Sequence, residues 1–172
     1  MTARIININD LDYRVSPLPI PDALKPKYEG AKVGDIGRRL GATKLGYNVT
    51  VLPPGKCAFP AHNHYINEEM FLVLEGQGEV RVGDTTHPIK TGDVIACLTG
   101  GPETAHQIHN NSKAELRYLA LSTRVSPEIV DYPDSGKFGV LAEMGPDKDG
   151  KPKLFRFIGR ADKPSDYWEG ES

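Results

Sequence analysis

The chain has 172 residues, 26% of them charged, and a formal net charge of -2. A chain of this length can bury one good core without a second domain. The chain is nearly neutral and its Lys and Arg residues are dispersed, so it lacks the basic patch that is typical of nucleic-acid binding. No apolar segment is long enough to cross a membrane or to act as an export signal, so we expect a cytoplasmic protein in which Cys57 and Cys97 stay as thiols.

Residues 1–46 predict an extended N-terminal arm. The run Arg4–Ile8 predicts a strand, and the three prolines within residues 17–21 exclude a helix and favour extended chain. Ile5, Ile6 and Ile8 could add as a strand to a neighbouring subunit, which would cover a sheet edge. The alternative is that the arm folds back on its own barrel. We favour the first arrangement and therefore expect a homodimer.

Residues 47–123 predict the core of an antiparallel β barrel or sandwich. Short β-rich runs recur at regular spacing and are separated by turns rich in Gly, Pro and Asn. The runs are Tyr47–Leu52, Met70–Glu75, Glu79–Val82, Val94–Cys97, His106–His109 and Glu115–Leu121. No amphipathic helical period runs through the region. Alternate side chains should line the interior, and we expect Val49, Val51, Phe71 and Val73 among them.

Residues 124–172 predict a C-terminal extension that packs on the barrel. The segment is rich in proline and reads as mostly loop, with one strand-like run at Leu154–Ile158. No internal repeat is visible along the chain. One β domain with an arm and a loop-rich tail is therefore expected.

Four residues in the central segment predict a metal site. His62 and His64 are separated by one residue, so an extended backbone points both imidazoles to the same face. Glu69 can reach that face from the start of the next strand, and His106 supplies a third imidazole. Three neutral nitrogens and one anionic oxygen suit a divalent transition metal such as Zn, Mn, Fe or Ni, and the lack of a thiolate argues against a closed structural zinc site. The His-x-His pair alone is weak evidence, because two solvated loop histidines would look the same.

The residues around this set resemble the first motif of the cupin family. That motif consists of a glycine, His-x-His, a glutamate and a second glycine, and here it is matched by Gly55, His62 to His64, Glu69 and Gly76. The gap of six residues before Gly76 selects Glu69 over its neighbour Glu68. The resemblance covers about residues 47–122. It implies an all-β fold, the double-stranded β-helix or jelly roll, with a metal in the barrel, and it also favours a homodimer.

The second cupin motif is less regular in this chain. It opens at Gly92 and closes at His106 to Asn110, but a longer turn, residues 98–105, replaces the usual Pro-x-Gly step. His109 competes with His106 as the ligand. His106 and Asn110 share one strand face, whereas Gln107 and His109 share the other. The cupin pattern pairs its ligand histidine with that asparagine, so the resemblance favours His106. His87 precedes Pro88 in a turn-like stretch and is expected to be an ordinary surface histidine.

The cupin fold by itself does not select a function, because cupins include isomerases, dioxygenases, decarboxylases and binding proteins. The segments 132–134 and 167–170 resemble small bacterial cupins called sugar-phosphate-isomerase-like. The resemblance implies a metal-dependent protein that acts on a small hydroxylated or carboxylated metabolite, with a sugar phosphate isomerase as the first hypothesis. A non-haem iron dioxygenase and a non-catalytic binding or sensing cupin are the alternatives. Glu68, Lys56 and Tyr47 are candidates for a catalytic base only through their closeness in sequence.

Overall fold

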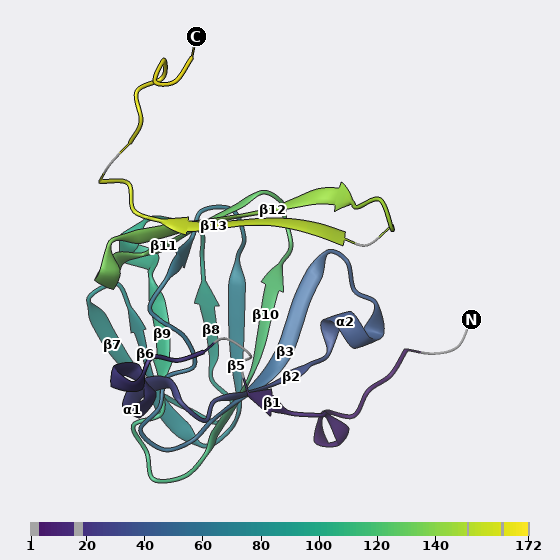
Figure 1. Ribbon diagram of the computed structural model, residues 1–172. Coiled ribbons are helices and arrows are strands. Elements are labelled where there is room, and N and C mark those ends of the chain that lie inside the picture. Colours follow the sequence, from purple (N-terminus) through teal and green to yellow (C-terminus); the bar gives the residue numbers. More distant parts are fainter. Residues whose placement is uncertain (1–3, 16–18, 151, 163, 172) are drawn as a thin grey trace.

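A computed structural model describes residues 4–15, 19–150, 152–162 and 164–171 of the chain. Its strands pair throughout in antiparallel fashion and form three sheets (Figure 1). The largest sheet contains, in spatial order, β1 (Arg14–Val15), β2 (Lys32–Asp35), β3 (Leu45–Leu52), β10 (Leu116–Thr123), β5 (Glu69–Glu75) and β8 (Val94–Cys97). A second contains β7 (Thr85–Lys90), β6 (Gln77–Val82) and β9 (His106–His109), and a third contains β13 (Pro152–Gly159), β12 (Lys137–Pro146), β11 (Glu128–Tyr132) and β4 (Asn63–His64).

The helices are short and lie mostly outside the barrel wall. The two α-helices are α1 (Lys25–Tyr28) and α2 (Gly37–Leu40), and single 3-10 turns lie at Ile8–Asp10, Asp22–Leu24, Pro102–Thr104 and Pro133–Ser135. Across the part of the chain that the structure describes, no helix combines the length and the apolar character needed to cross a membrane. The helices therefore serve as connections and covers for a β fold.

The six strands predicted for the central segment are all present, with ends that differ from the prediction by at most two residues. Strand β7, which was expected to be a turn-like stretch, was missed. It pairs only with β6, so Pro88 lies on an edge strand, where its missing N–H removes no bond from the middle of a sheet. His87 is exposed on this strand, as predicted for a surface histidine.

The main core lies between the six-stranded and the three-stranded sheets. Its buried members are Leu52, Phe71, Val73, Val80, Ile89, Cys97, Ile108, Leu116 and Tyr118. Val49 instead joins Leu11 and Ile36 in a second cluster, on the outer face of β3 beneath the N-terminal arm. The prediction that Val49 and Val51 line the interior is therefore wrong, because alternation points Thr50 and Leu52 inward and the arm buries the outer face as well.

The N-terminal arm lies on its own barrel in this chain. Strands β1 and β2 extend the large sheet beside β3, and Ile6 and Ile8 pack against the second core cluster. The strand predicted at Arg4–Ile8 is wrong, since residues 4–7 form no regular element and a 3-10 turn begins at Ile8. Within the three-proline segment, residues 17 and 18 fall outside the described residues. The homodimer stays a prediction.

The C-terminal segment contains more strand than the sequence predicted. Three strands, β11, β12 and β13, replace the single expected strand, and β13 includes the predicted run Leu154–Ile158. Strand β11 pairs with β4, so Val130 lies opposite His64. The hairpin β12–β13 lies across one end of the barrel, while α1 lies near the other end (Figure 1). The extension thus reaches directly to the strand that carries one predicted metal ligand.

Candidate metal centre

The structure brings all four predicted ligands together. His62, His64, Glu69 and His106 each offer one ligand atom, and these atoms lie within 4.8 Å of one another. His62 comes just before β4, His64 lies in β4, Glu69 opens β5 and His106 opens β9. Asn63, between the first two histidines, is fully buried, and its amide donates to a backbone carbonyl at 2.8 Å. Four side chains from three strands, β4, β5 and β9, therefore converge on one point.

Backbone pairing sets the spacing between two of the imidazoles. The N–H of His62 donates to the carbonyl of His106 at 3.2 Å, and the N–H of His106 donates back at 2.8 Å. This reciprocal pair holds the two residues side by side. His109 lies elsewhere, with its Nδ1 2.8 Å from Glu79 Oε1, so it is His106 and not His109 that joins the cluster.

Hydrogen bonds to carbonyl groups orient two of the rings. His62 Nδ1 donates to the carbonyl of Pro60 at 2.8 Å, and His106 Nδ1 donates to the carbonyl of Thr104 at 3.3 Å. A carbonyl can only accept, so each Nδ1 carries the proton and each Nε2 faces the cluster. His106 Nε2 lies 3.0 Å from Glu69 Oε2. Such outer hydrogen bonds are the usual means of fixing the tautomer of a metal-binding histidine.

His64 supplies the clearest sign that the cluster fits a cation. Both of its ring nitrogens are buried and have no hydrogen-bond partner among the described residues. Nε2 lies 3.7 Å from Glu69 Oε2, and Nδ1 lies 3.8 Å from Glu128 Oε1. A buried imidazole without partners costs free energy unless something binds it. A divalent metal between Nε2 and the other donors would satisfy it, so the residues present fit such an ion.

The protonation states of His62 and Glu69 suit metal binding, whereas His64 holds its proton more firmly. Burial, reinforced by the neighbouring His106, lowers the pKa of His62 to about 4, so His62 is neutral near pH 7. Burial would raise the pKa of Glu69, but the contact with His106 and the nearby His64 outweigh it and hold that pKa far below its usual range. Burial likewise opposes protonation of His64, yet the carboxylates of Glu69 and Glu128 leave its pKa above the ordinary value. A bound cation would displace that proton.

Glu128 is a buried carboxylate that no motif or spacing in the sequence marks as part of a site. It accepts backbone N–H bonds from Ile66 at 3.4 Å, Asn67 at 3.0 Å and Ile129 at 3.1 Å, and the side-chain amide of Asn67 also donates to it. These bonds hold the carboxylate beside Nδ1 of His64. A strand of the C-terminal extension therefore supplies the group that can orient a ligand of the central segment.

We expect the change Glu128→Gln to weaken metal binding by about 10- to 100-fold, the usual cost of losing a carboxylate behind a ligating histidine. Competition with a coloured chelator measures this affinity, and thermal melting reports whether the variant folds. Glu79→Gln is the matched control, because Glu79 pairs with His109 outside the cluster. Equal metal affinities for the folded Glu128→Gln variant and the native chain would contradict the role given to Glu128.

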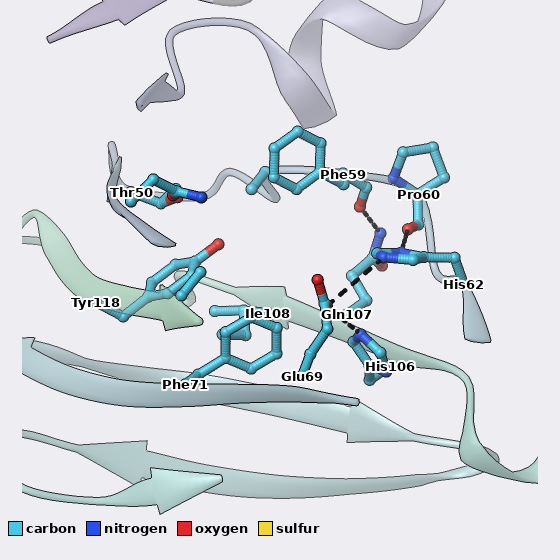
Figure 2. A pocket seen from close by; sticks show the side chains of 13 residues that line it. Thr50, Phe59, Pro60, His62, Glu69, Phe71, His106, Gln107, Ile108 and Tyr118 are labelled. Atoms are coloured by element: carbon cyan, nitrogen blue, oxygen red, sulfur yellow. Dashed lines mark hydrogen bonds and ion pairs between the residues drawn. The ribbon is translucent and has the colours of Figure 1, made fainter. Parts of the chain in front are cut away.

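The cluster forms part of the wall of a cavity of about 280 Å³ inside the barrel (Figure 2). His62, Glu69 and His106 line it together with the side chains of Thr50 and Tyr118. The Tyr118 hydroxyl and the Glu69 carboxylate both point into this space (Figure 2). Burial raises the pKa of Tyr118, so the phenol keeps its proton and can donate a hydrogen bond. Tyr118 and Thr50 are polar groups of the site that sequence reasoning missed.

The three residues that were candidates for a base lie away from this cavity. Lys56 Nζ donates to the carbonyls of Lys25 at 3.2 Å and Pro26 at 2.8 Å, in the N-terminal arm. Tyr47 packs against the outer core cluster, and Glu68 is exposed. None of them lines the cavity. Closeness in sequence misled here because it does not fix the direction in which a side chain points.

Comparison with known proteins agrees with this architecture. Residues 48–122 match the family described as Cupin domain. An oxalate-binding protein of Thermotoga maritima is 36% identical over 70 residues, which are 41% of this chain and 54% of that protein. The chain spans about half the length of the curated relatives it matches.

Solved structures extend the likeness beyond the central segment. A sugar phosphate isomerase from a cupin superfamily, from Silicibacter pomeroyi, has a TM-score of 0.74 and 24% identity, with 92% of this chain and 93% of that chain covered. A candidate sugar phosphate isomerase of Acidithiobacillus ferrooxidans has a TM-score of 0.61 and 26% identity, with 73% and 75% covered. These likenesses confirm the predicted jelly roll. The sequence of residues 48–122 thus matches the Cupin domain family, and the fold of the whole described chain is similar to that of solved cupin structures.

Proposed function

We propose that this protein is a metal-dependent isomerase of a small sugar phosphate. The observation that carries the proposal is a cluster of three histidines and one glutamate. Three of its members, His62, Glu69 and His106, line a cavity that also contains two hydroxyl groups. A divalent metal held by these four residues would supply Lewis-acid polarisation of a substrate oxygen. The sugar phosphate isomerases among the similar structures support this substrate class.

The residues of the chain itself have separate tasks in this proposal. Tyr118 donates a hydrogen bond, or its proton, to a substrate oxygen that gains negative charge as a proton moves between adjacent carbons. Thr50, whose hydroxyl donates to Asn48 Oδ1 at 3.0 Å, lines the same cavity beside it. Phe71 and Ile108 close the apolar side and exclude water. The volume of about 280 Å³ suits a small metabolite rather than a long hydrocarbon or an oligonucleotide.

The test is proton exchange at the carbon next to a sugar carbonyl. The metal-loaded protein is incubated in D₂O with a panel of aldose and ketose phosphates, and NMR follows loss of the C–H signal and formation of the isomer. We expect exchange and interconversion that stop on chelation and return when metal is restored. Turnover that continues without metal, or a panel that is inert with the metal-loaded protein, would contradict the proposal.

A second candidate function is the binding of a small dicarboxylate without turnover. The oxalate-binding relative from Thermotoga maritima favours it, and two adjacent carboxylates can chelate a metal through its open positions. Metal-dependent oxalate affinity combined with inert sugar phosphates would select this function. The non-haem iron dioxygenase would instead require redox-active iron, so identification of the metal that co-purifies separates it from both.

A further inference from the structure

A second cavity, of about 350 Å³, also reaches the metal centre. Its wall includes the two ligands His64 and Glu69, and it lies where the hairpin β12–β13 crosses the end of the barrel. The hairpin contributes Leu141, Glu143 and Leu154 to the lining. We call this space the rim cavity. The four ligand side chains therefore border two spaces, the interior cavity and the rim cavity, and Glu69 lines both.

Strand register places Arg124 in the rim cavity close to the ligands. Ser122 lies opposite Glu69 in the pairing of β10 with β5. The backbone N–H of Arg124 donates to the carbonyl of Lys44 at 2.9 Å, so the chain stays extended for two more residues. Arg124 thus shares the face of Ser122 and lies about 6.6 Å farther along the strand.

Gly46, opposite Ser122 on β3, leaves room for both side chains. A Cβ atom at this glycine would lie 2.9 Å from the Ser122 hydroxyl oxygen and 3.6 Å from Cδ of Arg124. A larger residue would therefore push one of them aside. Arg124 is the one Lys or Arg among the residues that line the rim cavity within the described chain.

Among the described residues Arg124 has one side-chain partner, Glu143, and that ion pair is easily broken. Its Nη2 donates to Glu143 Oε1 at 2.9 Å, with 45% of the arginine side chain and 61% of the glutamate side chain exposed. Ion pairs as exposed as this contribute little to stability. The guanidinium carries five N–H donors in a planar fork that matches a phosphate group, so an anion of higher charge can replace the carboxylate.

We propose that Arg124 binds the phosphate group of the substrate in the rim cavity, and that Glu143 holds the guanidinium in place until the phosphate arrives. This assignment rests on the proposed function, because it places the other end of the sugar phosphate at the metal centre. Glu143 then acts as a competitor of the substrate. Removing it should tighten phosphate binding, whereas removing Arg124 should weaken it.

The opposite signs of the two effects provide the test. Fructose 6-phosphate and fructose are titrated by calorimetry into the metal-loaded full chain and its Arg124→Gln and Glu143→Gln variants. We expect Arg124→Gln to weaken fructose 6-phosphate binding by about 10- to 100-fold, the worth of a charge-assisted hydrogen bond, and to leave fructose binding unchanged. Glu143→Gln should strengthen fructose 6-phosphate binding. If the ion pair had only a structural role, both variants would change fructose 6-phosphate affinity in the same direction, because each removes the same pair.

Oxalate serves as the internal control, since it would chelate the metal without the arginine. Its affinity should be equal in the native chain and in the Arg124→Gln variant. The inference is overturned if the two variants shift fructose 6-phosphate affinity in the same direction, or if the native chain binds fructose 6-phosphate no more tightly than fructose. If only the proposed isomerase activity is wrong, the outcome is distinguishable. Phosphate binding would still depend on Arg124, while the proton-exchange assay would show no exchange.

Discussion

Replacing His62 and His64 together by alanine is expected to abolish metal binding while the barrel stays folded. The change removes two of the three imidazole nitrogens from the cluster, and one imidazole with one carboxylate cannot hold a transition metal tightly. The fold rests on other residues, chiefly fully buried side chains such as Leu52, Val73 and Leu116. Elemental analysis of the purified variant gives the metal content, and circular dichroism reports the fold.

A double variant at His87 and His109 is the matched control for this experiment. Both of these histidines lie outside the cluster, one exposed on β7 and one paired with Glu79. The control should keep its full metal content. Stoichiometric metal in the folded His62→Ala, His64→Ala variant would show that the site assignment is wrong.

Replacing Tyr118 by phenylalanine is expected to lower kcat by about 100-fold or more, the usual scale for loss of a positioned proton donor. The ring of Tyr118 packs edge-on against Phe71 with centroids 5.5 Å apart, and phenylalanine preserves that contact. Only the hydroxyl in the cavity is lost. Metal content should therefore equal that of the native chain, and the measurement is isomerisation kinetics on the phosphate that the native chain turns over.

Tyr65→Phe is the control, because it removes a hydroxyl outside the interior cavity. Tyr65 donates to Asp131 Oδ2 at 2.7 Å and does not line the cavity. We expect its kinetics to match those of the native chain. A Tyr118→Phe variant that loses only substrate affinity, with kcat intact, would rule out a role for the hydroxyl in the chemical step.

The candidate ligands could be predicted because they depend on local periodicity and motif spacing. Alternation along a strand places His62 with His64 and separates His106 from His109, and the gap to Gly76 distinguishes Glu69 from Glu68. The structure brings the chosen four into one cluster. None of these steps required knowledge of long-range packing.

The side chains around the ligands could not be predicted, because their roles depend on contacts between distant segments. Both faces of β3 are buried, one by the barrel core and the other by the N-terminal arm, so hydrophobicity could not show that Val49 points outward. Glu128 reaches His64 only because β11 pairs with β4. Tyr118 faces the metal cluster across the barrel, and no local signal in its strand marks it as part of a site.

The central claim is that His62, His64, Glu69 and His106 hold one divalent metal. Anomalous X-ray diffraction from crystals of the metal-loaded protein tests it most directly, because the signal locates the ion without reference to the expected site. We expect a single strong peak between the four side chains, with metal–ligand distances of about 2.0–2.3 Å. A peak at another place, or no peak in crystals grown with a stoichiometric metal supply, would contradict the account.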